Sequence, residues 1–157
     1  MNRRLLEVAR LARGFMPEEE GIALYKAGLE GALHGPLLEI GSYCGKSTVY
    51  LGAAASERGA VLFSVDHHRG SEEHQPGEEF FDPELYDRSD GRVDTLSEFR
   101  RTIARAGLED TVVAIVGDSA TVAREWKGLL GLVFIDGGHS QAAADSDFEG
   151  WAPRVSS

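Results

Sequence analysis

Apolar and polar positions along this chain predict two N-terminal helices, followed by short strands that alternate with helices. An apolar stripe from Leu5 to Phe15 has helical spacing, with Asn2 placed to cap that helix and Gly14 to end it. Pro17 and the three glutamates after it predict the start of a second helix, because proline and acids both suit a first turn. Four short apolar runs are typical of buried strands, at 37–40, 61–65, 112–116 and 132–135. The patterns between them predict helices at 47–57, at 94–106 with Asp94 as the cap, and at 119–126. Such alternation predicts an α/β fold with a parallel sheet covered on both faces.

Residues 67–92, called the long segment below, interrupt this alternation. They hold eight acidic side chains and three of the five histidines, together with Pro76 and Pro83. A loop of this length is usually functional or disordered. It follows the second predicted strand, at the carboxyl edge where open α/β sheets bind ligands, so we favour a loop beside a substrate over a solvated surface excursion.

A glycine turn after the first predicted strand carries the clearest signal for chemistry. The strand holds Glu39, and the chain then turns through Gly41 and Gly45 into a predicted helix. Such a turn points free backbone N–H groups at one place, and glycine lets a ligand approach closely. Gly45-Lys46-Ser47 resembles the end of a phosphate-binding P-loop, but that motif needs four residues between its glycines and Gly41 leaves three. The dinucleotide pattern G-x-G-x-x-G is not met either. The remaining E-x-G-x-x-x-G is a ligand-binding turn or a tight turn without a ligand.

Acids also stand at the ends of the later strands. Asp66 ends the second strand, 25 residues after Gly41, where an acid can accept hydrogen bonds from ribose hydroxyls or cap a helix. Asp118 and Ser119 follow the third strand and can cap the next helix.

The fourth strand runs into Asp136, two glycines and His139. An aspartate here suits Mg²⁺ and a histidine suits a general base. Taken alone, the pair is by default a capping aspartate and a solvent-exposed histidine, but beside the glycine turn and Asp66 it is the best catalytic candidate in the sequence.

Composition limits the class of protein. The 157 residues suit one domain, and 42% hydrophobic with 27% charged residues is ordinary for a globular chain. The net charge of −10 argues against nucleic acid or an anionic membrane as partner, and no apolar run approaches the roughly 20 residues that span a bilayer. The N-terminus is amphipathic rather than a secretory signal. A single cysteine, Cys44, fits a reducing cytoplasm, either as a small buried side chain or as a reactive thiol.

Three strings in this order, LLEIGSYCGKST, VDHH and FIDGGHS, resemble class I S-adenosylmethionine (SAM) dependent methyltransferases, in particular the bacterial group related to metal-dependent sugar O-methyltransferases. The resemblance runs from GFMPEEE (14–20) to DFEGWAPRV (147–155). The string DHHRGSEEHQPG is similar to an actinobacterial group that methylates mannose-containing saccharides.

This resemblance implies one SAM-binding domain over 1–157, with N-terminal helices at 1–35 and a Rossmann-like core at 36–157. It implies a small saccharide as acceptor, His139 as the base and Asp136 as a Mg²⁺ ligand. It further implies cofactor contacts from Glu39, Gly41, Ser42, Tyr43, Gly45, Ser47, Asp66, His67, Asp118 and Ser119.

The chain departs from this family in its strand count. The family has seven strands, only four are predicted here, and the sequence stops at 155–157, where the fifth would begin. We therefore expect a sheet truncated after the fourth strand, with an exposed apolar edge and a metal site short of ligands, or a short domain that a partner chain completes. Two other classes stay open: a nicotinamide-dependent oxidoreductase, and a non-catalytic fragment that binds a cofactor or a partner. A homodimer is compatible with the sequence, which does not set the oligomeric state.

Overall fold

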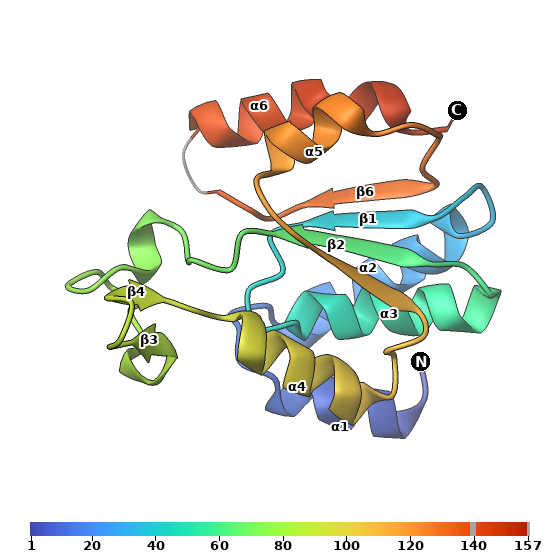
Figure 1. Cartoon of the computed structure of the whole chain (residues 1–157). Coiled ribbons are helices and arrows are strands. Elements are labelled where there is room, and N and C mark those ends of the chain that lie inside the picture. The colour runs from blue at the N-terminus through green and yellow to red at the C-terminus, as the bar shows by residue number, and fades with distance from the viewer. Residues whose placement is uncertain (139–140, 157) are drawn as a thin grey trace.

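A four-stranded parallel sheet lies between two layers of helices (Figure 1). The computed structural model describes residues 1–138 and 141–156, and only the backbone of residue 141. The strands are β1 (Leu37–Ile40), β2 (Leu62–Asp66), β5 (Val112–Val116) and β6 (Leu132–Ile135), in the order β5-β2-β1-β6. Each neighbouring pair is parallel, so all four carboxyl ends lie at one edge. The predicted α/β class and the four predicted strands are confirmed.

The helices cover both faces of this sheet. Helices α1 (Arg3–Leu11), α2 (Glu18–Gly31), α3 (Lys46–Arg58) and α4 (Leu96–Ala106) lie on one face, and α5 (Ser119–Glu125) and α6 (Gln141–Trp151) lie on the other (Figure 1). Side chains alternate along β1, so Leu37 joins the core under α1 to α4 while Leu38 joins the core under α5 and α6. The inner strand β1 is therefore buried on both faces.

The first helix is capped as its sequence predicts but is shorter. Asn2 Oδ1 accepts a hydrogen bond from the Leu5 N–H at 2.9 Å. The helix ends at Leu11, so the prediction that its apolar stripe extends to Phe15 is wrong. Phe15 lies in the connection to α2 with 61% of its surface exposed, beside a cavity described below.

The other predicted helices begin and end within a residue or two of the observed bounds. Helix α2 starts directly after Pro17, as predicted. Asp94 is not the cap residue of α4, because Thr95 occupies that position. The Asp94 carboxylate still accepts a hydrogen bond from the first N–H of that helix, on Leu96, at 2.9 Å.

The long segment is more ordered than a loop. It contains two single-turn 3₁₀ helices, η1 (Glu72–His74) and η2 (Pro83–Leu85), and most of a two-stranded antiparallel sheet of β3 (Tyr86–Asp87) and β4 (Arg92–Val93). Leu85 and Val93 pack on the buried Cys44 of the glycine turn. The segment projects from the carboxyl edge of the sheet (Figure 1), which is where the sequence predicted it.

Helix α6 is an element that the sequence pattern did not predict. Its last residue, Trp151, is fully buried and donates from Nε1 to Ser119 Oγ at 2.8 Å, which ties α6 to the start of α5. After the 3₁₀ turn η3 (Ala152–Arg154), Val155 forms a parallel bridge with Leu130, beside β6. Among the described helices, none combines the length and the apolar character that crossing a membrane requires.

Candidate functional site

Three cavities meet at the carboxyl edge of the sheet, and Gly41 lines all of them. The larger cavity measures about 430 Å³, the smaller one about 200 Å³ and a narrow third one about 40 Å³. Of the residues predicted to bind a ligand, the larger cavity takes Gly41, Ser42, Tyr43, Ser47 and Asp136, and the smaller takes Gly41, Asp66, His67, Asp118 and Ser119. Residues from four different strand ends are thus brought to one continuous site.

Gly41 is fixed by its backbone conformation and by close packing against the turn after β6, neither of which its motif predicts. Its φ of +83° lies in the left-handed region that favours glycine. A Cβ atom at this position would stand 2.3 Å from Gly137 Cα and 2.5 Å from the backbone oxygen of Asp136. The turn after β6 packs directly against this position and therefore requires glycine there.

Glu39 lies behind the glycine turn rather than in a cavity. Its side chain is fully buried and accepts hydrogen bonds from the hydroxyls of Ser47 at 2.5 Å, Thr48 at 2.6 Å and Ser64 at 2.8 Å. Burial raises the pKa of this carboxyl, and the three hydroxyl donors oppose that shift. Neither Glu39 nor Gly45 is among the lining residues of the three cavities. Gly45 is the N-cap residue of α3, and a Cβ added there would point toward α4. Their predicted contact with a cofactor stays a prediction.

Asp66 organises the same turn from the second strand. Its Oδ2 accepts from the N–H groups of Ser42 and Tyr43, both at 2.8 Å, and its Oδ1 accepts from His68 N–H at 2.7 Å. A carboxylate oxygen has two lone pairs, so Oδ1 retains acceptor capacity toward a ligand in the smaller cavity that it lines. The sequence predicted a ribose contact but did not reveal this bracing of Tyr43, whose φ is +48°.

The smaller cavity continues from Asp66 to the start of α5. Asp118 caps α5 by accepting from the Thr121 N–H at 2.8 Å and from its hydroxyl at 2.7 Å, and these bonds lower the pKa of the Asp118 carboxyl. The capping role that the sequence predicted is confirmed, and the adenine-side role stays a prediction. His67 is exposed at the mouth, with Nδ1 accepting from the Arg69 N–H at 3.0 Å.

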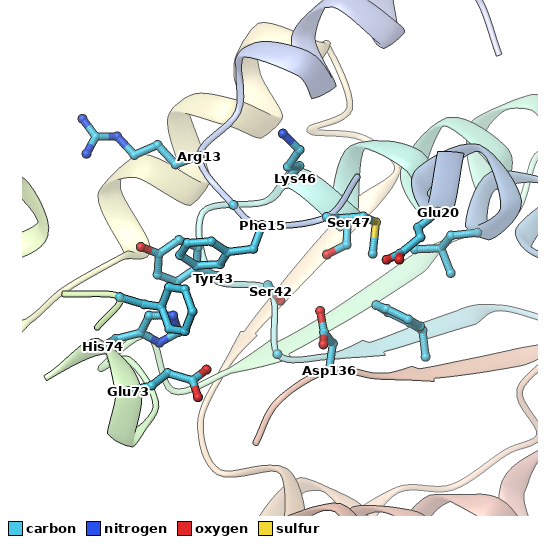
Figure 2. A pocket seen from close by; sticks show the side chains of 16 residues that line it. Arg13, Phe15, Glu20, Ser42, Tyr43, Lys46, Ser47, Glu73, His74 and Asp136 are labelled. Carbon is cyan, nitrogen blue, oxygen red and sulfur yellow. The ribbon is translucent and has the colours of Figure 1, made fainter. Parts of the chain in front are cut away.

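Four aromatic side chains, here called the aromatic wall, form one side of the larger cavity: Phe15, Tyr43, His74 and Phe80. Tyr43 and His74 stack with ring centroids 4.7 Å apart and planes 20° apart, while Phe15 and Phe80 meet edge to face at 4.9 Å. Figure 2 shows Phe15, Tyr43 and His74 gathered on one side of the space, with Asp136 and Glu20 across from them. These rings come from three separate parts of the chain.

Charged side chains line the rest of the larger cavity. Glu20 reaches it from α2, Glu73 from η1 and Asp136 from the end of β6 (Figure 2). Two cations also line it, but Arg13 forms ion pairs with Asp82 at 2.5 Å and with Glu84, in the long segment. Lys46, in the first turn of α3, donates from Nζ to the backbone oxygen of Ala12 at 3.4 Å.

The predicted metal and base residues are only partly covered by the structure. Asp136 lies directly after β6, where its backbone N–H donates to the oxygen of Ile40 at 2.8 Å. His139 lies outside the described residues, so its role stays a prediction. Within the described part of the chain, no three His, Cys, Asp or Glu side chains gather closely enough to hold a metal ion. The described residues therefore do not by themselves fit a resident Mg²⁺.

The sequence did not predict that side chains of the long segment and of the connection between α1 and α2 line the site. Glu73 and His74 lie in the string DHHRGSEEHQPG, which assigned them no role in the site, and Phe80 lies outside any motif. His68 was also missed: it is buried with φ +58°, its Nδ1 lies 2.8 Å from Thr95 Oγ1, and burial lowers its pKa. Burial likewise raises the pKa of Cys44 to about 12, which favours the buried-side-chain alternative over a reactive thiol.

A parallel sheet with a glycine turn after its first strand and cavities at its carboxyl edge defines a Rossmann-like α/β protein of the type that binds nucleoside ligands. The sequence profile of the methyltransferase domain family matches residues 38–157, and the chain belongs to this family.

Solved structures with the same fold include three methyltransferases. The O-methyltransferase TomG of Streptomyces achromogenes, involved in tomaymycin synthesis and solved with SAM, is 16% identical, with a TM-score of 0.64 over 99% of this chain and 62% of its own. An O-methyltransferase of Bacillus cereus in complex with S-adenosylhomocysteine (SAH) is 19% identical, with a TM-score of 0.61 over 99% and 63%. An SAH-bound methyltransferase of Podospora anserina is 15% identical, with a TM-score of 0.63 over 99% and 59%. The chain thus spans less than two thirds of the length of these proteins.

Proposed function

We propose that this chain binds SAM and belongs to an O-methyltransferase that transfers the methyl group to a hydroxyl of a small saccharide. The observation that carries this proposal is the pair of cavities that share Gly41. The smaller cavity is lined by Asp66 at the end of β2 and Asp118 after β5, and the larger cavity is lined by the start of α3. Family membership supports methyl transfer, and the cofactors of the three structural neighbours support SAM. The saccharide rests on the resemblance of the long segment alone.

The two cavities divide the cofactor between them. The smaller cavity takes the nucleoside, with Asp66 toward the ribose and Asp118 and Ser119 on the adenine side. The amino-acid part then crosses Gly41 into the larger cavity. Its carboxylate suits the first turn of α3, because Ser47 and the cation of Lys46 lie there at the positive end of the helix.

The chemistry needs alignment and removal of one proton. The acceptor oxygen attacks the methyl carbon of the sulfonium, the carbon–sulfur bond breaks and SAH leaves. Holding the oxygen in line with that bond supplies several kcal/mol of the barrier, by the general scale of positioning effects. The hydroxyl proton passes to His139, which we propose as the general base.

Asp136 has two roles in this proposal. It lines the larger cavity, and the resemblance makes it a ligand of a Mg²⁺ that would acidify the acceptor hydroxyl. The described residues do not complete a metal site, so Asp136 would need further ligands to hold this ion. Dependence of turnover on Mg²⁺ in a chelator titration would support the assignment.

Calorimetric titration separates this function from its alternatives. The chain should bind SAH and should not bind NADH, whereas binding of NADH alone would establish the oxidoreductase alternative. Asp66→Ala should weaken SAH binding by roughly 1–3 kcal/mol, the scale of hydrogen bonds to a charged group. Asp110→Ala, an exposed acid beside β5, is the matched control and should bind SAH like the parent chain. SAH binding without methyl transfer would leave the non-catalytic fragment as the better description.

A further inference from the structure

The two ends of the long segment are joined at its base by His68. The segment begins just after β2, where His68 lies, and it leads into Thr95 at the start of α4. The Thr95 N–H donates to the backbone oxygen of His68 at 3.1 Å, and His68 Nδ1 lies 2.8 Å from Thr95 Oγ1. Both residues are buried. A backbone bond and a ring bond from the same residue therefore fasten the entrance of the segment to its exit.

From these contacts we infer that His68 is a positioning residue, which holds the long segment against the glycine turn while its ring is neutral and releases the segment when the ring takes up a proton. The segment carries His74 and Phe80 of the aromatic wall. His68 itself is not among the lining residues of the three cavities, so it acts on the site through this segment. The inference rests on the proposed function only where it concerns methyl transfer, because the fastening involves no ligand.

His68 is also tied to the glycine turn, through the carboxylate of Asp66. This carboxylate accepts from the His68 N–H at 2.7 Å and from the N–H groups of Ser42 and Tyr43, both at 2.8 Å. Among the described residues, Tyr43 and His68 are the two non-glycine residues with a positive φ, +48° and +58°. Such conformations persist only where the surrounding contacts impose them. Loss of the contacts with Thr95 would therefore let His68 relax and would loosen the support of the glycine turn.

The surroundings of the His68 ring suit its neutral form. The ring packs against Phe99 of α4, with 5.0 Å between the ring centroids. Within the part of the chain that the structure describes, its Nε2 has no hydrogen-bond partner. A protonated imidazole carries an N–H donor on both nitrogens. Protonation in the closed segment would therefore bury a charge together with an unsatisfied donor, which is costly.

The sign of the pH dependence follows from the groups around the ring. Burial lowers the pKa of His68, and the neighbouring His67 adds to this shift. Asp66 at the end of β2, Asp94 before α4 and the backbone of Tyr43 oppose the shift without reversing it. When the segment opens, the ring meets water and regains the ordinary histidine pKa. The open state then binds the proton more tightly, so the fastened state is favoured above that ordinary pKa and is lost as the pH falls below it.

Hydrogen exchange of the whole chain between about pH 8 and pH 5, measured by mass spectrometry, tests this inference. The exchange rate of each peptide is divided into its intrinsic rate at the same pH, which gives a protection factor. In the parent chain, the protection of the long segment should be constant at the alkaline end. It should then fall by up to about tenfold per pH unit, the limit for one proton. Peptides of β1 and α3 should keep their protection over the same range.

Two substitutions at His68 separate the hydrogen bond from the charge. Asparagine can bond to Thr95 from the position of Nδ1 and tolerates a positive φ, but it takes up no proton. His68→Asn should therefore keep the segment protected at every pH and remove the pH dependence, whereas His68→Ala should leave the segment open to exchange at every pH. His34→Asn removes an exposed histidine outside the segment, so it is the matched control and should keep the parent profile.

Three results would overturn the inference: protection of the long segment that does not change with pH in the parent chain, a parent-like pH profile in His68→Asn, or parent-like protection in His68→Ala. The protection of β1 and α3 reports whether each variant has folded, and the parent chain and His68→Asn decide the question even if His68→Ala does not fold. Calorimetry with SAH at neutral pH keeps the two proposals apart. Absence of SAH binding would refute the proposed function, whereas the exchange profiles test the fastening by His68 alone.

Discussion

The contact between Gly41 and the turn after β6 can be tested by adding a single methyl group. In Gly41→Ala, the new Cβ would stand 2.3 Å from Gly137 Cα, where real Cβ contacts essentially never fall below 3.0 Å. Two costs follow: about 1–2 kcal/mol for a non-glycine residue in the left-handed region, and about 1–3 kcal/mol for displacing packed backbone. We expect the variant to lose about 2–5 kcal/mol of unfolding free energy, a large share of the roughly 5–15 kcal/mol typical of a domain.

A second glycine separates the two costs. Gly59 also has a positive φ, +69°, but a Cβ there meets no heavy atom within 4 Å, so Gly59→Ala should lose only the first cost, about 1–2 kcal/mol. Urea unfolding followed by the fluorescence of Trp126 and Trp151 measures both variants, and calorimetry with SAH measures whether the site has moved. If Gly41→Ala is as stable as Gly59→Ala and binds SAH normally, the packing argument is refuted.

Three further predictions concern the buried acid, the ion pairs and the reaction. Burial raises the pKa of Glu39, so the folded chain retains a proton that the unfolded chain releases. The free energy of unfolding should therefore fall as the pH rises from the ordinary glutamate pKa through the raised one. Parallel plots of this free energy against pH for the parent chain and Glu39→Gln would contradict the prediction. Arg13→Gln should speed proteolysis within the long segment, as should high salt in the parent, whereas Arg101→Gln, which loses a surface pair with Glu98, should not. Asp136→Asn should abolish most of the activity together with its dependence on Mg²⁺. His139→Ala should lower turnover by roughly 10²–10⁴-fold and leave the SAH affinity unchanged. If activity survives both substitutions and the addition of a chelator, the metal-assisted mechanism is refuted.

The elements of this fold could be predicted because their signals are local. Each strand of the sheet is a short run of apolar residues, and each predicted helix shows a stripe, a cap or a proline within its own sequence. The parallel sheet followed from their alternation, and it alone places Asp66, Asp118 and Asp136 at one edge. The candidate cofactor site was therefore largely within reach of sequence reasoning.

Tertiary structure decided what each of these residues touches. Glu39 pairs in register with Ser64 on the neighbouring strand, and this hydroxyl and the hydroxyls of α3 surround its carboxyl with buried hydrogen bonds that the sequence did not predict. The aromatic wall joins Phe15, which helical spacing wrongly assigned to α1, to His74, 59 positions later in the numbering and 5.9 Å away between ring centroids. Such contacts leave no periodic trace, because their energy comes from packing between segments whose separation along the chain is set by the fold around them.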